Sequence, residues 1–290
     1  MNTKDSTKNM YLAVIPENGQ MDGFMVLMDS YNTTPKDLLT LTDIPKQASQ
    51  NGILTIIPAL STGSSFFGSD LASHESLKEI IDHAVSKYQL KDKNFYIGGF
   101  SIGGTCAVKY AELSAKNNYS IKPKAVFAIA SPLDWERYYN AAKRVVRISE
   151  KDKVNQEVYF MLDRIEKEMS GTPQNAQSNF YSNSPYSFSD STQSAIKNLI
   201  STPIMLISEP DILWWLNERG YDISYNNIFD HAAMINELQK LGNTHAVLVT
   251  TTDKGYRKPH NMRHPISWSI ADPEVLIKWL LSDTKQGYSK

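Results

Sequence analysis

Short apolar runs alternate along the chain with longer stretches in which apolar residues recur at helical spacing. The runs are rich in β-branched and other apolar side chains, and turn-forming or polar residues bound them. Runs of this length and composition are typical of strands buried in the interior of a sheet. We therefore expect strands at residues 10–15, 24–29, 53–58, 95–99, 125–130, 203–208 and 246–252.

The stretches between most of these runs have the period of amphipathic helices. In residues 74–88, the apolar side chains that fall on one helical face are Leu77, Ile80, Ile81, Ala84 and Val85. Residues 273–281 form a last helical pattern near the end of the chain. Strands that alternate with helices predict the α/β class, with a mostly parallel central sheet and helices on both faces. In such sheets, sites form at the carboxyl ends of the strands.

Residues 134–200 break this alternation. They contain no convincing strand but show two helical patterns, which a polar stretch rich in Ser, Asn and Tyr follows. Long excursions of this kind in compact domains are usually functional. We expect a single domain over residues 1–290, in which residues 134–200 form a helical cap above a pocket at the strand ends. A surface excursion without such a role is the alternative.

Composition and charge narrow the possible functions. Hydrophobic residues make up 41% of the chain and charged residues 21%, as is ordinary for a globular protein. The formal net charge of -1 gives no basic surplus for binding nucleic acid or an anionic membrane. The single cysteine, Cys106, excludes an intrachain disulfide and a cysteine metal cluster.

The chain also lacks the sequence signals of membrane insertion. No apolar run is long enough to span a bilayer. The polar residues 1–9 lack the apolar segment of a signal peptide. We therefore expect a cytoplasmic protein, or a secreted or periplasmic one if a leader has been removed.

The stretch GGFSIGG, residues 98–104, carries the most specific motif in the chain. Gly99 to Gly103 read G-x-S-x-G, with a predicted strand before the motif and a helical pattern after it. In a nucleophile elbow the serine has a strained backbone, and its neighbours must be small because strand and helix come very close. Ser101 is therefore the candidate nucleophile, and the Ile102 N–H would face a developing oxyanion. A glycine-rich turn with an incidental serine is the structural alternative.

A serine needs a base that accepts its proton and a carboxylate that orients the base. Two carboxylates follow the predicted strand at 203–208, namely Glu209 and Asp211. The spacing from that strand favours Asp211, and Glu209 is the alternative.

Two histidines, His260 and His264, follow the last predicted strand. Their spacing of four is that of a helical metal pair, but Pro259 and Pro265 argue against a helix there, so we expect no metal site. His264 lies nearer the last helix and near Trp268, which favours it as the base over His260.

The order of these features resembles that of the α/β-hydrolase superfamily, over residues 10–281. The chain is most similar to esterase-like bacterial members with a GGFSIGG elbow, a PD-x-x-WW stretch at 210–215 and an RHP-x-SWSI stretch at 263–270. This resemblance implies a catalytic triad of Ser101, Asp211 and His264. It also implies that the Tyr31 N–H completes the oxyanion hole with that of Ile102.

The chain departs from the family pattern at two places. The oxyanion loop, which often reads His-Gly-x, here reads Asp29-Ser30-Tyr31. Many members place the histidine directly before a Ser-aromatic pair, whereas this chain has Ile266 before Ser267 and Trp268. If that register governs, the base is missing unless His264 reaches the site from two residues earlier.

We expect a serine hydrolase that cleaves a carboxylic ester of a small molecule and needs no cofactor. An amidase or peptidase would use the same residues, and a binding protein on a hydrolase scaffold or an acyltransferase are further alternatives. Aromatic residues at the predicted strand ends form either a substrate pocket or part of the core. The candidates for the pocket are Trp135, Tyr139, Trp214 and Trp215.

Overall fold

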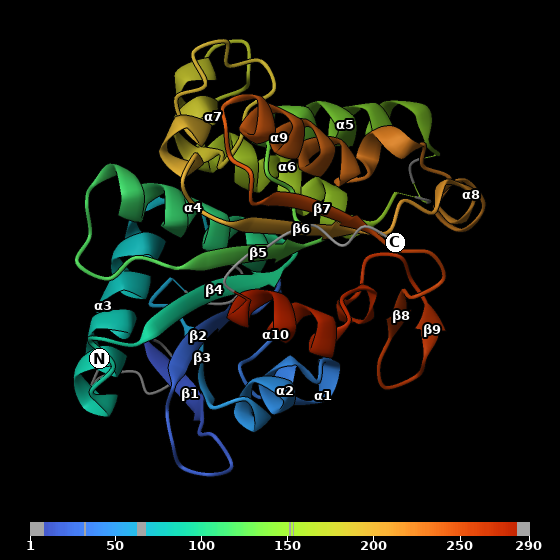
Figure 1. Cartoon of the computed structure of the whole chain (residues 1–290). Helices are drawn as coiled ribbons and strands as arrows, with labels where there is room; N and C mark the ends of the chain where they lie inside the picture. The colour runs from blue at the N-terminus through green and yellow to red at the C-terminus, as the bar shows by residue number, and fades with distance from the viewer. Residues whose placement is uncertain (1–8, 32, 63–67, 151, 153, 283–290) are drawn as a thin grey trace.

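The computed structural model describes residues 9–31, 33–62, 68–150, 152 and 154–282. A sheet of seven strands, in the order β1-β3-β2-β4-β5-β6-β7, runs through the centre (Figure 1). All the predicted strands are present in it, and every neighbouring pair is parallel except β1 and β3. The strands are β1 (Met10–Val14), β2 (Gly23–Met28), β3 (Ile53–Ala59), β4 (Asn94–Phe100), β5 (Ala125–Ile129), β6 (Ile204–Ser208) and β7 (Ala246–Thr250).

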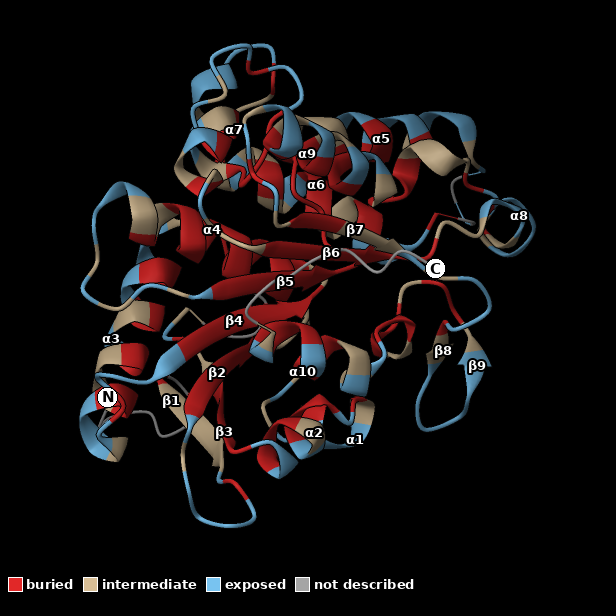
Figure 2. Ribbon diagram, viewed as in Figure 1, coloured by how far each residue is buried: buried red, intermediate tan, exposed pale blue. Residues whose placement is uncertain are grey.

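Helices cover both faces of the sheet, as the alternating pattern predicts. One apolar core lies between the sheet and α3, α4 and α9, and a second lies between the sheet and α1, α2 and α10. The central strands are buried throughout (Figure 2). These helices are α1 (Leu38–Leu41), α2 (Ile44–Gln50), α3 (Leu71–Tyr88), α4 (Ile102–Lys116), α9 (Ile228–Lys240) and α10 (Pro273–Leu281).

Side-chain caps explain where several helices begin. The Asp70 carboxylate accepts a hydrogen bond from the Ser73 N–H at the start of α3, and Asp272 caps α10, whose first residue is Pro273. Proline suits this first position because its missing N–H would have no partner there. None of the helices within the described ranges is long and apolar enough to cross a membrane.

The segment between β5 and β6 is helical, as its sequence pattern predicts. It contains α5 (Trp135–Ile148), α6 (Gln156–Glu168), α7 (Gln177–Asn183) and the 3-10 turn η1 (Ile196–Leu199). A third apolar core joins α5, α6 and α7 to Ile102 of α4 and to Trp215, Tyr221 and Tyr225. The Arg137 guanidinium of α5 forms an ion pair with the Asp230 carboxylate of α9, which fixes the inserted helices to the sheet layer.

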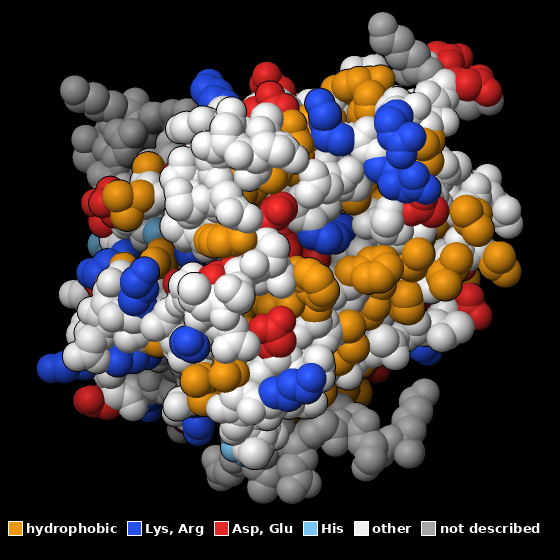
Figure 3. All heavy atoms as spheres, turned by 90° about the horizontal axis from the view of Figure 1, so that it is seen from above, with side chains coloured by type: hydrophobic (Ala, Val, Ile, Leu, Met, Phe, Trp, Pro, Cys, Tyr) orange, Lys and Arg blue, Asp and Glu red, His pale blue; other side chains and the backbone are white. Residues whose placement is uncertain are grey.

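Short elements follow β6 and β7 at the carboxyl ends of the strands. After β6 come α8 (Ile212–Trp214), the π-helical turn η2 (Trp215–Arg219) and the 3-10 turn η3 (Ile223–Tyr225). After β7 a hairpin of β8 (Tyr256–Arg257) and β9 (Met262–Arg263) leads to η4 (Trp268–Ile270). Figure 3 shows hydrophobic side chains gathered at the edge where Figure 1 places α8, and Ile212, Leu213 and Leu216 are exposed there.

Candidate active site

Ser101 occupies a sharp turn between β4 and α4. Its backbone has φ 53° and ψ −128°, a conformation that a non-glycine residue adopts only under constraint. A Cβ atom on Gly99 would lie 2.8 Å from the Met28 carbonyl oxygen, and one on Gly103 would lie 2.1 Å from the Asp29 carbonyl oxygen. The inner glycines therefore let strand, helix and the loop after β2 meet around the serine, as the motif predicts.

The outer two glycines have other neighbours. A Cβ atom on Gly98 would lie 2.3 Å from the Phe127 ring of the adjacent strand. A Cβ atom on Gly104 would lie 2.0 Å from the Ser131 hydroxyl oxygen. These glycines admit side chains of β5 and of the turn that follows it, so they serve the packing of the elbow against the sheet.

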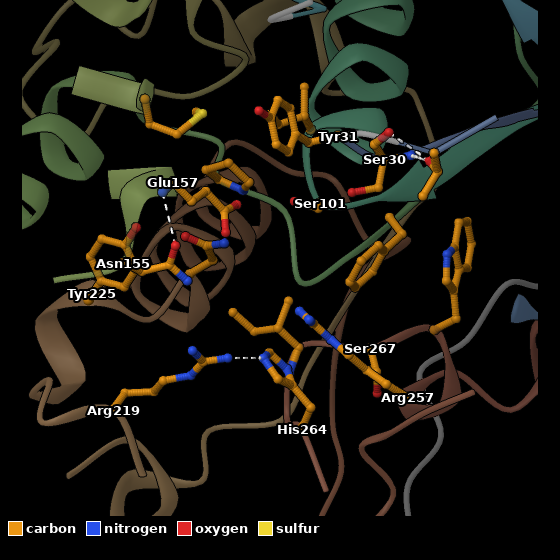
Figure 4. Close-up of a pocket in the computed structure, with 18 of the residues that line it drawn as sticks. Ser30, Tyr31, Ser101, Asn155, Glu157, Arg219, Tyr225, Arg257, His264 and Ser267 are labelled. Atoms are coloured by element: carbon orange, nitrogen blue, oxygen red, sulfur yellow. Dashed lines mark hydrogen bonds between the residues drawn. The ribbon is translucent and has the colours of Figure 1, made fainter. Parts of the chain in front are cut away.

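A cavity of about 400 Å³ lies over Ser101 at the carboxyl ends of the strands. Its walls come from segments far apart in the sequence, including the loop after β2, the start of α6, η2 and the β8–β9 hairpin (Figure 4). This volume is typical of small-molecule sites. Polar and charged residues of the wall include Ser30, Ser101, Asn155, Glu157, Arg219, Arg257 and His264.

Two backbone amides at the cavity wall are available as donors. Ile102 is the first residue of α4. Tyr31 lies two residues after Asp29, whose carbonyl oxygen packs closely against Gly103. Neither amide donates a hydrogen bond within the part of the chain that the structure describes. The Ser30 N–H donates to the Thr33 hydroxyl oxygen at 3.0 Å, which holds the Tyr31 loop in shape. The two amides have the chemistry of an oxyanion hole.

His264 lines the same cavity, and only 7% of its surface is exposed. Arg219 Nη2 lies 2.9 Å from His264 Nε2 (Figure 4). The Ile266 N–H points at His264 Nδ1 over 3.2 Å. A neutral imidazole can accept a hydrogen bond at only one nitrogen. One of these two contacts is therefore unsatisfied in either tautomer.

Positive charge surrounds the His264 ring. Burial, followed by the charges of Arg257 and Arg219, lowers the pKa of His264 to about 3. The Trp214 indole lies against the ring, with centroids 4.7 Å apart, and the Arg219 guanidinium lies over the same indole. The imidazole is thus neutral near pH 7, and its protonated form is disfavoured.

Both candidate acids contact Arg263, the residue before His264. Asp211 Oδ1 accepts the Trp214 N–H at 3.0 Å, and Asp211 Oδ2 lies 2.6 Å from Arg263 Nη2. Glu209 is buried and lies 2.5 Å from Arg263 Nη1. Its carboxylate also accepts hydrogen bonds from the Thr251 hydroxyl and the N–H groups of Lys254 and Gly255.

The structure thus brings Ser101 and His264 to one cavity but joins neither acid to the histidine. No hydrogen bond connects the Ser101 hydroxyl to His264 among the described residues, and Asp211 lies outside the cavity wall. His260 is exposed in the turn of the β8–β9 hairpin, away from the cavity wall.

The predicted aromatic pocket needs correction, because only Trp215 of its four members lines the cavity. Trp135 is fully buried and donates its indole N–H to the Ser69 hydroxyl oxygen, since α5 turns that face inward. Tyr139 donates to Glu166 of α6, and Trp214 lies behind His264. The other aromatic residues of the wall are Tyr31, Phe100, Tyr138, Tyr221, Tyr225, Tyr256 and Trp268.

Sequence reasoning did not identify Arg219, Arg257 or Arg263 as site residues. Arg219 lies four residues after Trp215, and this helical spacing was the only available signal that both face one cavity. Arg257 reaches the cavity only because the β8–β9 hairpin folds over the strand ends. Among the described residues, no cluster of His, Cys, Asp and Glu side chains is arranged to hold a metal ion.

No protein family model and no curated protein matches this chain. Solved structures do match it. FphF, a fluorophosphonate-binding serine hydrolase of Staphylococcus aureus, aligns with 98% of this chain and 97% of its own at 13% identity and a TM-score of 0.56. An S-formylglutathione hydrolase of Agrobacterium tumefaciens aligns with 97% of this chain and 92% of its own at 9% identity and a TM-score of 0.54.

A peptidase is also among the solved structures that match. The acylaminoacyl peptidase of Pyrococcus horikoshii aligns with 97% of this chain and 40% of its own, at 12% identity and a TM-score of 0.55. At such identities the likeness concerns the fold, because one fold serves many activities. With the parallel sheet and the strained serine turn at the end of β4, these alignments establish that the chain has the α/β-hydrolase fold.

Proposed function

We propose that this protein is a serine hydrolase that cleaves a carboxylic ester through an acyl-enzyme on Ser101. The observation that carries the proposal is the strained backbone of Ser101 at the floor of the cavity, beside the Ile102 and Tyr31 amides, which have no acceptor among the described residues. Strain of this kind persists where the surrounding structure enforces it, and it is concentrated at active sites. An incidental serine in a turn would not need such a backbone.

In the proposed reaction, Ser101 Oγ attacks the ester carbonyl carbon while His264 Nε2 takes the hydroxyl proton. The negative charge that develops on the carbonyl oxygen is stabilised by the Ile102 and Tyr31 N–H groups. His264 then returns the proton to the leaving alcohol. Water, activated by the same imidazole, cleaves the acyl-enzyme.

Three contacts must open for this sequence of steps. The Ile266 N–H must leave His264 Nδ1, because Nδ1 carries the proton when Nε2 acts as the base. Arg219 must leave His264 Nε2, which is the nitrogen that would face the serine. For the acid we propose Asp211, because its one side-chain partner among the described residues is Arg263, whereas four described donors hold Glu209. If Asp211 exchanges Arg263 for His264, its carboxylate would stabilise the imidazolium.

We further propose that the inserted segment acts as a cap. Asn155, Glu157, Val158 and Met161, from the start of α6, line the cavity over Ser101. These polar and apolar side chains of the inserted segment face the proposed nucleophile. They can exclude water from the cavity and select the acyl or alcohol group of the substrate.

A fluorophosphonate probe together with 4-nitrophenyl acetate tests the nucleophile and the base. We expect labelling and turnover in the wild type, loss of both in Ser101→Ala, and loss of turnover in His264→Ala but not in His260→Ala. Labelling that persists in Ser101→Ala would remove the serine assignment. Retained turnover in His264→Ala combined with loss in His260→Ala would move the base to His260.

A second candidate is a binding protein on a hydrolase scaffold. The contact of Arg219 with His264 and the attachment of both acids to Arg263 favour it, because no complete relay is assembled among the described residues. An unlabelled wild type that nevertheless binds small molecules in this cavity would support this second function. An amidase or peptidase would use the proposed residues and would be detected with 4-nitroanilide substrates.

A further inference from the structure

Two guanidinium groups line the cavity over Ser101 without forming an ion pair with a carboxylate of the described residues. Arg219 contacts the neutral His264 imidazole and the Trp214 ring, and Arg257 extends toward the middle of the cavity in Figure 4. Neither forms an ion pair with a carboxylate of the described residues. By contrast, Arg137, Arg144 and Arg263 are each paired with an acid.

The cavity therefore holds excess positive charge. Among the described residues of its wall, Glu157 is the single carboxylate, whereas Arg219, Arg257 and Lys258 are cationic. Lys258 is paired with Asp43 at 3.1 Å, which leaves two guanidinium groups and one carboxylate. Residue Arg257 as a whole is exposed, but its guanidinium end turns inward. Desolvation there, followed by repulsion from Arg219, lowers its pKa, and the smaller attraction of the Glu157 carboxylate does not offset them. A bound anion would offset both the desolvation of the Arg257 guanidinium and its repulsion from Arg219.

We infer that the substrate is an ester that carries an anionic group, a carboxylate or a phosphate, which Arg219 and Arg257 bind in this cavity. A guanidinium group forms stronger, charge-assisted hydrogen bonds with such anions than with a neutral imidazole. Anion binding would therefore draw Arg219 away from His264 Nε2. This inference rests on the proposed function of Ser101 and His264.

The anion would also supply the negative charge that His264 lacks for stabilising its protonated form. In the structure, the carboxylates that could stabilise an imidazolium are bound to Arg263, and the cations nearest the ring disfavour it. A negative charge placed between Arg219 and Arg257 would offset those cations as the imidazole takes the serine proton. The substrate would thus complete the charge balance of the base.

Matched ester pairs test this inference. One pair places the charge on the acyl group, 4-nitrophenyl hydrogen adipate against its neutral isostere 4-nitrophenyl 6-methylheptanoate. The other places it on the leaving group, 4-acetoxybenzoate against 4-acetoxybenzamide. We expect the wild type to prefer the anionic member of one pair by about tenfold or more in kcat/KM, the size of one charge-assisted contact.

Substitution of the two arginines should abolish that preference. We expect Arg219→Gln and Arg257→Gln each to lower the anionic-to-neutral ratio by about tenfold, while Arg144→Gln, whose guanidinium pairs with Asp222 outside the cavity wall, keeps the ratio. A wild type that cleaves the neutral members at least as well, or a ratio that survives both substitutions, would overturn the inference.

A binding measurement separates failure of the inference from failure of the proposed function. Calorimetry on Ser101→Ala uses monomethyl adipate and phenyl phosphate as carboxylate and phosphate probes, with methyl hexanoate as the neutral control. Binding of one anionic probe that Arg257→Gln weakens about tenfold supports the anion site even if no ester is cleaved. Turnover of neutral esters without binding of either anion would retain the hydrolase and reject the anion site.

Discussion

Arg219 Nη2 lies 2.9 Å from His264 Nε2, so a guanidinium occupies the imidazole nitrogen that would receive the Ser101 proton. The contact couples η2, which follows β6, to the segment after the β8–β9 hairpin. It holds the proposed base in a state that is neutral but not directed at the nucleophile. The availability of His264 therefore depends on what else Arg219 can bind.

Replacing Arg219 by methionine should release the base. We expect Arg219→Met to raise kcat/KM for the neutral ester 4-nitrophenyl acetate by about three- to tenfold, because Nε2 becomes free and one cation leaves the ring. Stopped-flow or steady-state assays at pH 7 measure the change. Arg144→Met, on the outside of α5, is the matched control and should leave the rate constant unchanged.

The pH profile of the free enzyme should reflect the low pKa of His264. Because burial and the charges of Arg257 and Arg219 lower that pKa from 6.5 to about 3, the imidazole stays in its basic form across the neutral range. We expect kcat/KM for a neutral ester to show no acid limb near pH 6.5. In Arg219→Met the pH at which kcat/KM falls on the acid side should rise toward the ordinary pKa of histidine. A wild-type limb at pH 6.5 would contradict this assignment.

The strain at Ser101 predicts a difference between two inactive variants. Glycine adopts positive φ without steric cost, whereas alanine keeps the strain of φ 53°. We expect Ser101→Gly to unfold with a free energy about 1 kcal/mol higher than Ser101→Ala. Urea denaturation followed by circular dichroism measures both. Equal stability of the two variants would mean that the turn relaxes in solution.

The close contact at Gly103 predicts that one added methyl group strongly destabilises the folded protein. A Cβ atom there would lie 2.1 Å from the Asp29 carbonyl oxygen, so Gly103→Ala must separate α4 from the oxyanion loop. We expect a loss of about 2 kcal/mol or more in unfolding free energy and of turnover. Gly220→Ala is the comparison, because its Cβ atom would meet open space and only its positive φ carries a cost.

Asp29 predicts a pH dependence of stability. Desolvation raises the pKa of Asp29 from 3.8 to about 8, so the folded protein favours the protonated carboxyl group. The stability from this group is fully present below pH 3.8 and is lost as pH rises through about 8. We expect Asp29→Asn to be more stable than the wild type at pH 9, with the difference disappearing toward pH 4. Chemical denaturation at both pH values tests the sign.

The features that the sequence predicted correctly all depend on short-range patterns. Buried strands need continuous apolar runs, and the elbow needs small residues on both sides of Ser101, because chain neighbours and adjacent strands impose those limits directly. The helical nature of residues 134–200 follows from apolar spacing within that segment. The α/β class, the parallel sheet and the position of Ser101 therefore follow from the order of residues alone.

The environment of His264 was decided by tertiary structure alone. Whether His264 contacts a carboxylate or a guanidinium depends on how η2 and the β8–β9 hairpin pack over the strand ends, and these segments are separated along the chain. The same holds for Arg263, which holds both Glu209 and Asp211. Electrostatic contacts between long side chains have no local period in the sequence, because distance in space and burial set their strength. The sequence thus determined the α/β scaffold and the glycine-rich turn that holds Ser101, and the folded arrangement determined the charges that surround His264.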